Sequence, residues 1–260
     1  MHRKEGTDVW RATFPDGTRA VVKRVERSYI HAPELLLMEQ VRGERGFVQL
    51  EGTYHDARGA LCLVMPEYPG DLLTTILESA DGLPVADARS VASSVAPSLV
   101  HLHERLRALH LDVKPDNLLA DNRRSGVRGG GGYLLGDFGC ALSLPPTDGR
   151  EPAAVMVADD ETVGTPAYAP PEMGDDSGRP PPYRLTEKSD AYSLGATLFA
   201  TITRRTPHTR DRDALVRDML DRCESRADER FVSDCVGGWL EPDPERRATV
   251  RSGIESVSVS

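Results

Sequence analysis

HLDVKPDN, at residues 110–117, is the most informative stretch of this sequence. It places Asp112, Lys114 and Asn117 within six residues of one another, and so offers a base, a cation and an oxygen ligand for a metal. Asp137 follows twenty residues after Asn117, within a GDFG motif, and adds a second carboxylate ligand. A base, a lysine and two oxygen ligands are the groups that phosphoryl transfer from a magnesium-bound nucleotide requires.

Other motifs, in this order, resemble those of the eukaryotic-type protein kinases. The resemblance runs from about Gly6 to about Thr249, which is nearly the whole chain. Four stretches carry it: RAVVK at 19–23 is similar to the strand with the ATP-positioning lysine, GTPAYAPPE at 164–172 to the end of an activation segment, SDAYSLG at 189–195 to the start of a large buried helix, and DPERR at 243–247 to the motif whose last arginine pairs with the activation-segment glutamate, here Glu172.

This resemblance implies an α+β, bilobal fold in which residues 1–260 form a single protein kinase domain. The sheet-rich N-lobe is expected at about 1–67, the hinge at about 65–70 and the helical C-lobe at about 71–260.

The residue patterns predict the same layout. Asp16-Gly17 indicates a hairpin turn between strands at 9–14 and 20–25, and Pro33 opens a helix. Further strands are expected at 47–50 and 61–65, a hairpin at 118–120 and 133–135, and a polar loop at 145–161. Apolar residues at steps of three and four from Val91 to Leu106 predict a buried helix that Pro97 should kink or split, with His101 and His103 on its surface.

The resemblance also assigns roles to the residues of the first motif. Asp112 would orient the acceptor hydroxyl and take its proton, and Lys114 would neutralise the transferred phosphate. A lysine at this place is typical of the serine/threonine kinases. Asn117 and Asp137 would bind Mg²⁺ through oxygen atoms. The alternative for Asp112 and Asn117 is an ordinary turn or capping role.

Lys23 would contact the α- and β-phosphates of ATP and pair with a helix glutamate. Glu34, Glu39 and Glu44 compete for that pairing. Glu34 is favoured because the sequence that it begins, ELLLM, resembles the helix pattern of the family. A plain strand-edge lysine is the alternative for Lys23.

Met65, Glu67 and Tyr68 resemble the family's hinge, which receives adenine through backbone groups. The stretch 61–68 supplies the apolar wall that an aromatic base needs. The alternative is a strand that simply leaves the core.

The sequence departs from the family at three places. The glycine-rich phosphate loop is reduced to Gly6, and no strand is expected before it. Leu111 replaces the arginine that normally precedes the catalytic aspartate and binds a phosphorylated loop. The Ala-Pro-Glu tripeptide reads Pro-Pro-Glu at residues 170–172.

The bulk composition limits the partners. The chain has 260 residues and a net charge of −9, which argues against a nucleic-acid partner. No apolar run approaches the roughly 20 residues that span a bilayer, and the start lacks the apolar core of a secretory signal. We expect a monomer without a membrane span, located inside the cell, in the cytoplasm or nucleus. LVMPEY at 63–68 and LGDFG at 135–139 are similar to herpesvirus serine/threonine kinases, which would place the protein in an infected host cell.

The sequence therefore predicts a serine/threonine protein kinase that uses ATP and Mg²⁺ and acts on a protein substrate. Two alternatives stay open: a pseudokinase that serves as a binding or scaffold module, and a small-molecule kinase of the same fold.

Overall fold

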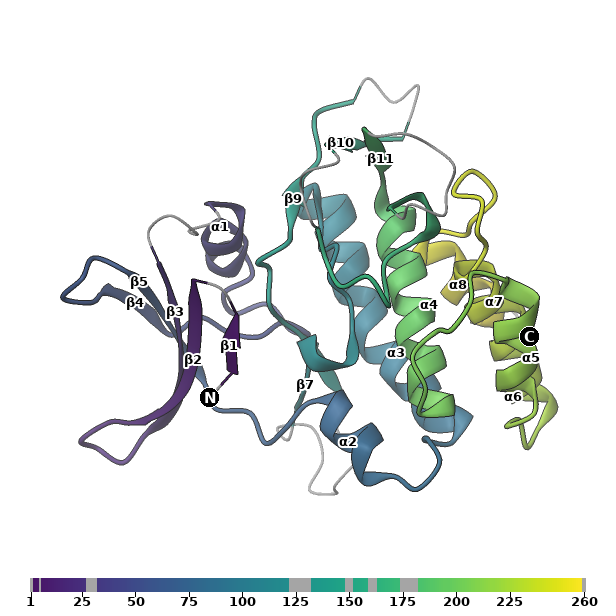
Figure 1. Ribbon diagram of the computed structural model, residues 1–260, viewed down its shortest axis with the longest axis horizontal. Helices are drawn as coiled ribbons and strands as arrows, with labels where there is room; N and C mark the ends of the chain where they lie inside the picture. The colour runs from purple at the N-terminus through teal and green to yellow at the C-terminus, as the bar shows by residue number, and fades with distance from the viewer. Residues whose placement is uncertain are drawn as a thin grey trace.

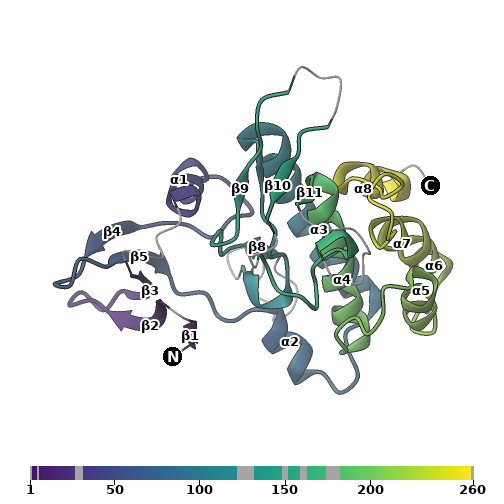
Figure 2. The same cartoon turned by 45° about the horizontal axis from the view of Figure 1, so that its top comes forward.

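The computed structural model describes residues 2–4, 6–26, 32–121, 132–147, 152–158, 163–173 and 182–258. A five-stranded sheet and helix α1 (Ala32–Gln40) form one part, which carries the N-terminus (Figure 1). The other part is mainly helical and carries the C-terminus, and the view in Figure 2 separates the same two parts. The expected α+β, bilobal fold is confirmed.

The sheet is antiparallel and follows the order β1-β2-β3-β5-β4. Its strands are β1 (His2–Lys4), β2 (Thr7–Thr13), β3 (Arg19–Val25), β4 (Gly52–His55) and β5 (Leu61–Pro66). The predicted hairpin joins β2 to β3: the Thr18 amide donates to Asp16 Oδ1 at 2.9 Å, and Gly17 has a φ of +84°, which favours glycine. β3 lies between β2 and β5, so Lys23 is at the middle of the sheet.

Two expectations for this sheet were wrong. Residues 47–50 are not a strand, although Phe47 makes one isolated bridge to Leu135. Phe47, Val48 and Leu50 are instead buried core residues, and β4, which pairs with β5, follows them. An edge strand such as β4 needs backbone pairing more than apolar side chains, so its sequence carried little signal.

A strand also precedes Gly6. β1 pairs with β2 from His2 opposite Val9 to Lys4 opposite Thr7. Gly6, which precedes β2, has a φ of +70°, a conformation that favours glycine. Three residues complete the edge of β2 through backbone hydrogen bonds, which need no apolar pattern.

The helical part is built around α4, in which every residue from Ser189 to Thr203 is buried. The Thr186 hydroxyl caps its N-terminus. The helices of this part are α2 (Leu72–Glu78), α3 (Val85–His101), α4 (Glu187–Thr203), α5 (Arg212–Leu220), α6 (Arg226–Arg230), α7 (Gly237–Trp239) and α8 (Val250–Ser258), with π-helical turns at Leu102–Leu106 and Phe231–Val236 and 3₁₀ turns at Pro115–Asn117 and Pro171–Met173. In the described residues no helix is long and apolar enough to cross a bilayer.

α3 is the helix predicted from the apolar steps of three and four. Pro97 does not split it, and this residue lies exposed on the solvent face. The helix then continues into the π-helical turn Leu102–Leu106. A π-helical turn inserts an additional residue and changes which side chains face the core.

Three small two-stranded sheets complete the fold. β6 (Ala108–Leu109) pairs with β9 (Leu142–Ser143), and β7 (Leu118–Ala120) pairs with β8 (Tyr133–Leu135), as the predicted hairpin requires. The connection at 122–131 lies outside the described residues. β10 (Val155–Val157) pairs with β11 (Tyr183–Leu185), so the expected loop at 145–161 contains a strand. Val157 of β10 is buried in the core.

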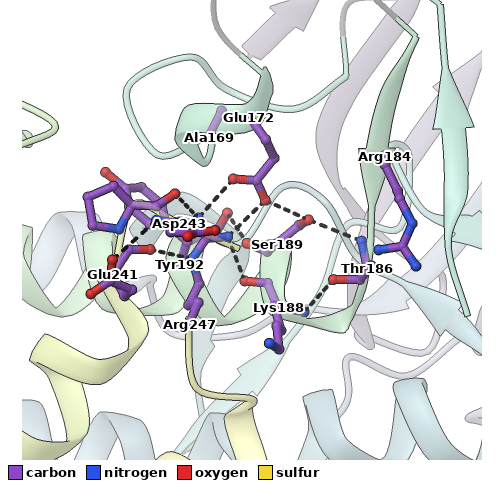
Figure 3. A network of polar contacts seen from close by, with 12 residues as sticks. Ala169, Glu172, Arg184, Thr186, Lys188, Ser189, Tyr192, Glu241, Asp243 and Arg247 are labelled. Carbon is purple, nitrogen blue, oxygen red and sulfur yellow. Dashed lines mark hydrogen bonds and ion pairs between the residues drawn. The ribbon is translucent and has the colours of Figure 1, made fainter. Parts of the chain in front are cut away.

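The expected ion pair between Glu172 and Arg247 is present (Figure 3). Arg247 donates from Nη1 to Glu172 Oε1 and from Nη2 to Oε2, both at 2.8 Å. Both residues are buried, with 6% of Glu172 and 1% of Arg247 exposed. Arg247 also donates to the carbonyls of Lys188, Glu241 and Pro242, so its guanidinium is well satisfied without water.

Arg247→Met should lower the free energy of unfolding by about 3–5 kcal/mol, because it leaves the Glu172 carboxylate buried without its cation. Urea denaturation measures this loss. Arg251→Met is the matched control: Arg251 makes a bidentate pair with Glu104 at 2.6 and 2.7 Å, but both side chains are exposed. Water already screens that pair, so the loss of Arg251 should change the free energy of unfolding little. Equal losses in the two variants would contradict the interpretation.

Candidate active site

The loop at residues 110–117 is held from below by Asp190 of α4. The Asp190 carboxylate is fully buried and accepts hydrogen bonds from the amides of His110 at 2.8 Å and Leu111 at 2.7 Å. Leu111 has a φ of +61°, a backbone conformation that residues other than glycine rarely adopt. The two hydrogen bonds stabilise this turn of the backbone, which sets the direction of the next residue, Asp112.

Asp112 is surrounded by three donors. Lys114 Nζ donates to Asp112 Oδ2 at 2.8 Å, and Asn117 Nδ2 donates to the same oxygen at 3.1 Å. The Thr165 hydroxyl donates to Oδ1 at 2.6 Å and accepts from Lys114 Nζ at 2.7 Å. A carboxylate oxygen has two lone pairs. Oδ2 is therefore filled by its two donors, whereas Oδ1 keeps one lone pair for a further donor.

These contacts keep Asp112 ionised. Burial alone would raise the pKa of Asp112, but the hydrogen bonds from Lys114 and Thr165 outweigh it and hold the pKa below the ordinary value. For Lys114, burial opposes the charge, while the hydrogen bond and the charge of Asp112 raise the pKa. Lys114 and Asp112 thus form a charged pair, in which Oδ1 of Asp112 can still accept a proton.

Lys23 lies between two carboxylates. Its Nζ is 2.5 Å from Glu34 Oε1 and 2.7 Å from Asp137 Oδ1. The predicted contact with Glu34 is confirmed, because this residue lies in the first turn of α1 facing β3, and no contact joins Lys23 to Glu39 or Glu44 among the ion pairs of the described residues. Burial opposes the charge of Lys23, but Asp137 and Glu34 together raise its pKa well above the usual range.

Asp137 is joined to the loop at residues 110–117, called the catalytic loop below, through the paired strands β7 and β8. Leu118 lies opposite Leu135, and the Gly136 amide donates to the Asn117 carbonyl at 3.0 Å. Asp137 has a φ of +60° and accepts from the Gly139 amide at 3.3 Å. A Cβ on Gly139 would lie 3.2 Å from Asp137 Oδ1 and 3.5 Å from Lys23 Nζ. Glycine therefore allows this close approach.

Phe138 and His110 support the same segment from the core. Phe138 is fully buried, and its ring lies 5.5 Å from that of His110 and 6.2 Å from that of Phe47. His110 is also fully buried, with its Nε2 3.0 Å from the Gly136 carbonyl oxygen. His110 thus packs as a structural residue.

The hinge residues connect β5 to α2. β5 reaches Pro66, opposite Ala20 of β3, and so places Met65 opposite Val21. The Glu67 carboxylate binds Arg19 at 2.6 Å and Arg11 at 2.8 Å. The Tyr68 hydroxyl accepts from the Gln49 amide at 3.2 Å. These two side chains are engaged with the protein, so a base bound here would be recognised through the backbone.

The site offers few metal ligands of its own. Within the part of the chain that the structure describes, no group of three or more His, Cys, Asp or Glu residues could hold a metal ion. Asn117 uses its amide nitrogen to donate to Asp112, which leaves the amide oxygen as its candidate ligand. With Asp137 this gives two oxygen donors, a set that suits a hard cation whose other ligands come from phosphate and water.

Leu111 anchors a small apolar cluster beneath the segment between Asp137 and Glu172. In place of a charged arginine, its side chain packs in a group with one residue from each neighbouring element, and only 5% of Leu111 is exposed. The cluster consists of Leu109, Leu111, Leu144, Val157 and Leu185. Apolar packing in this cluster joins β6, the loop at residues 110–117, β10 and β11.

Sequence reasoning missed three residues of the site. Thr165 and Asp190 both lie in stretches that resemble the family, but the resemblance assigns neither residue to the site. His103 was expected on a helix surface, but it is 4% exposed and its Nε2 is 2.7 Å from Asp190 Oδ2. The π-helical turn that contains His103 explains this error, since it departs from the helical period that was assumed.

The sequence pattern of the protein kinase domain matches residues 16–257. The chain belongs to the protein kinase family. Its kinase domain is 28% identical to the putative ribosomal protein S6 kinase alpha-2 of Caenorhabditis elegans over 251 residues, which cover 91% of this chain and 31% of that protein. It is 32% identical to the serine/threonine-protein kinase PknF of Mycobacterium tuberculosis over 178 residues, 67% of this chain and 31% of that protein. The chain thus spans about a third of the length of these curated relatives.

A chain in the structure of the CAK complex of Chaetomium thermophilum bound to ATP-gamma-S has a similar fold. The TM-score is 0.68 at 19% identity, with 98% of this chain and 87% of that chain covered. The family predicted from the sequence is confirmed, whereas the herpesvirus resemblance stays a prediction.

Phosphotransfer by this kinase domain should not depend on phosphorylation of Thr147 or of Thr162, which lies outside the described residues. Leu111 offers a phosphate no charge-assisted hydrogen bond, and its cluster already holds the segment. We expect phosphatase treatment of the purified protein to change turnover by less than about twofold. A large loss of turnover after treatment would mean that another basic residue binds a phosphate there.

Proposed function

We propose that this chain is an active serine/threonine protein kinase that transfers the γ-phosphate of ATP to a protein hydroxyl. The observation that carries the proposal is the carboxylate of Asp112, ionised and with one lone pair of Oδ1 left for a donor. The acceptor hydroxyl would donate to Oδ1. Because the pKa of Asp112 is low, the carboxylate mainly orients the hydroxyl and takes its proton late, which suits a loose phosphoryl-transfer transition state. Lys114, beside Asp112, would bind the phosphate in transfer.

ATP and Mg²⁺ fit the charges of the site. Glu34, Asp112 and Asp137 carry three negative charges, and Lys23 and Lys114 carry two positive charges, so the group is negative by one. A triphosphate adds further negative charge and needs a cation to bind here. When bound, Mg²⁺ would neutralise the phosphates. We assign Asn117 and Asp137 as its protein ligands, Lys23 with Glu34 as the phosphate contact, and Met65, Glu67 and Tyr68 as the hinge that receives adenine.

The same proposal covers the chain as a whole. Residues 1–260 would form one kinase domain, with an N-lobe at about 1–67, a hinge at about 65–70 and a C-lobe at about 71–260. The partner would be a protein bearing serine or threonine, and we expect a monomer that binds no nucleic acid and acts inside the cell. A pseudokinase is less well supported, because Lys23, Asp112, Asn117 and Asp137 are all present. The three charged residues are in ion pairs, and Asn117 donates a hydrogen bond to Asp112.

The test is transfer of radiolabelled γ-phosphate to a generic basic protein, with magnesium and with EDTA. The wild type should transfer phosphate only with magnesium. Asp112→Asn should lower turnover by roughly 10²–10⁴, because it removes the base, while ATP binding stays largely intact. Transfer by the variant at the wild-type rate would refute the role of Asp112. Absence of transfer by the wild type, together with a nucleotide-induced shift in Tm that EDTA leaves unaltered, would support a pseudokinase.

Lys23→Met should abolish transfer while the protein remains folded. Methionine fills a similar volume but offers no charge to the phosphates. The measurement is the rise in Tm on adding magnesium ATP, which should be lost, alongside turnover. Arg24→Met is a matched control in the same strand, because Arg24 pairs with Asp56 away from Lys23 and should keep both signals. If Lys23→Met keeps both, the nucleotide binds elsewhere.

A further inference from the structure

Arg210 contacts the turn that carries Thr165. This turn, residues 165–169, is closed by the amides of Tyr168 and Ala169, which donate to the Thr165 carbonyl at 2.9 and 3.1 Å. Two of the turn's other carbonyls receive the guanidinium of Arg210: Nη1 donates to Ala169, and Nη2 donates to Pro166 at 3.3 Å.

Arg210 is itself held in position by its neighbours. It precedes Asp211, whose side chain caps the N-terminus of α5 by accepting from the amides of Asp213 and Ala214. Its guanidinium lies 5.8 Å from the ring centroid of Tyr192, which is fully buried in α4, and Nη1 is 3.5 Å from the tyrosine hydroxyl. The other cation beside this ring is Arg247, at 5.0 Å, which Figure 3 shows next to Tyr192.

We propose that Arg210 is a positioning residue for phosphoryl transfer, because it clamps the turn 165–169 and so fixes the Thr165 hydroxyl on Asp112 Oδ1 and on Lys114. This inference rests on the proposed function. The oxygen that Thr165 occupies is the one whose remaining lone pair would take the acceptor hydroxyl. The turn also lies beside Asp112, so it flanks the place where an acceptor residue must enter. Displacement of the turn would therefore weaken the binding and alignment of the acceptor protein at Asp112. It would leave the nucleotide contacts of Lys23 and Asp137 unchanged.

The chemistry of the contact requires arginine. A guanidinium presents several N–H groups in a fixed plane and can reach two carbonyls at once, whereas the ammonium of lysine is a point charge on a flexible stem. Arg210→Lys should therefore retain only part of the effect. Arg205→Ala is a matched control, since Arg205 lies in the same connection between α4 and α5 but pairs with Asp218, at 2.6 Å.

Steady-state kinetics of the full chain with a generic basic protein separate the two substrates. For Arg210→Ala we expect kcat/KM for the protein substrate to fall about 10- to 100-fold, since a displacement of about 1 Å can cost 10²-fold. KM for ATP and the Tm rise with magnesium ADP should stay within about twofold of the wild-type values. For Arg210→Lys, kcat/KM for the protein substrate should lie between the values of the wild type and of Arg210→Ala. Arg205→Ala should match the wild type.

Hydrogen exchange of the amides at 163–173 supplies a readout that does not depend on turnover. Arg210→Ala should speed exchange of the Tyr168 and Ala169 amides, and Arg205→Ala should not. Unchanged exchange of these amides in Arg210→Ala would overturn the proposal. So would a loss of ATP affinity as large as the loss in kcat/KM for the protein substrate. If the wild type transfers phosphate and Arg210→Ala does so equally well, the role of Arg210 alone fails. If the wild type transfers none, the proposed function fails, and the role of Arg210 in transfer fails with it.

Discussion

The catalytic loop depends on one buried charge, the carboxylate of Asp190 in α4. A fully buried carboxylate is stable only when it is fully partnered. Asp190 receives the amides of His110 and Leu111 and a ring nitrogen of His103, and although burial opposes it, these contacts hold its pKa below the ordinary value. The backbone turn at Leu111 follows from this anchoring, and the direction of Asp112 follows from the turn. The buried helix α4 thus sets the direction of the residue that we propose as the base.

Two different interactions then hold the segment that faces Asp112. Its end is fixed by the buried ion pair of Glu172 and Arg247, and its middle by the apolar cluster around Leu111. Gly164, between them, lies so close to the loop that a Cβ would be 2.2 Å from the Leu111 carbonyl oxygen. These contacts bring Gly164 and its neighbours against the loop that carries Asp112, and none of them requires an arginine at position 111.

Local spacing made part of this site predictable. Asp112, Lys114 and Asn117 lie within six residues, and one short loop brings them together whatever surrounds it. The contact between Lys23 and Glu34 needed the resemblance to the kinases, because several glutamates follow the strand. Thr165 is 53 residues from Asp112, and no periodicity or spacing in the sequence indicates that they meet. A fold is needed to bring such residues together.

The fold itself was predicted best where turn residues or an apolar period mark an element, and worst where main-chain pairing alone forms it. The hairpin at Asp16-Gly17 follows from turn chemistry, and the helix α3 follows from apolar pattern. The apolar run at 47–50 predicts a strand because buried core residues and strand residues are of the same types. The actual edge strands, β1 and β4, are held by main-chain pairing and show little pattern.

The apolar cluster around Leu111 has a consequence for how the kinase domain responds to its surroundings. Arginine–phosphate contacts are screened as salt rises, because their attraction is electrostatic. Contacts among Leu109, Leu111, Leu144, Val157 and Leu185 involve no charge, and hydrophobic contacts weaken on cooling. The packing of these five residues should therefore be indifferent to ionic strength and sensitive to cold, so that temperature, more than salt, governs how firmly they are held together.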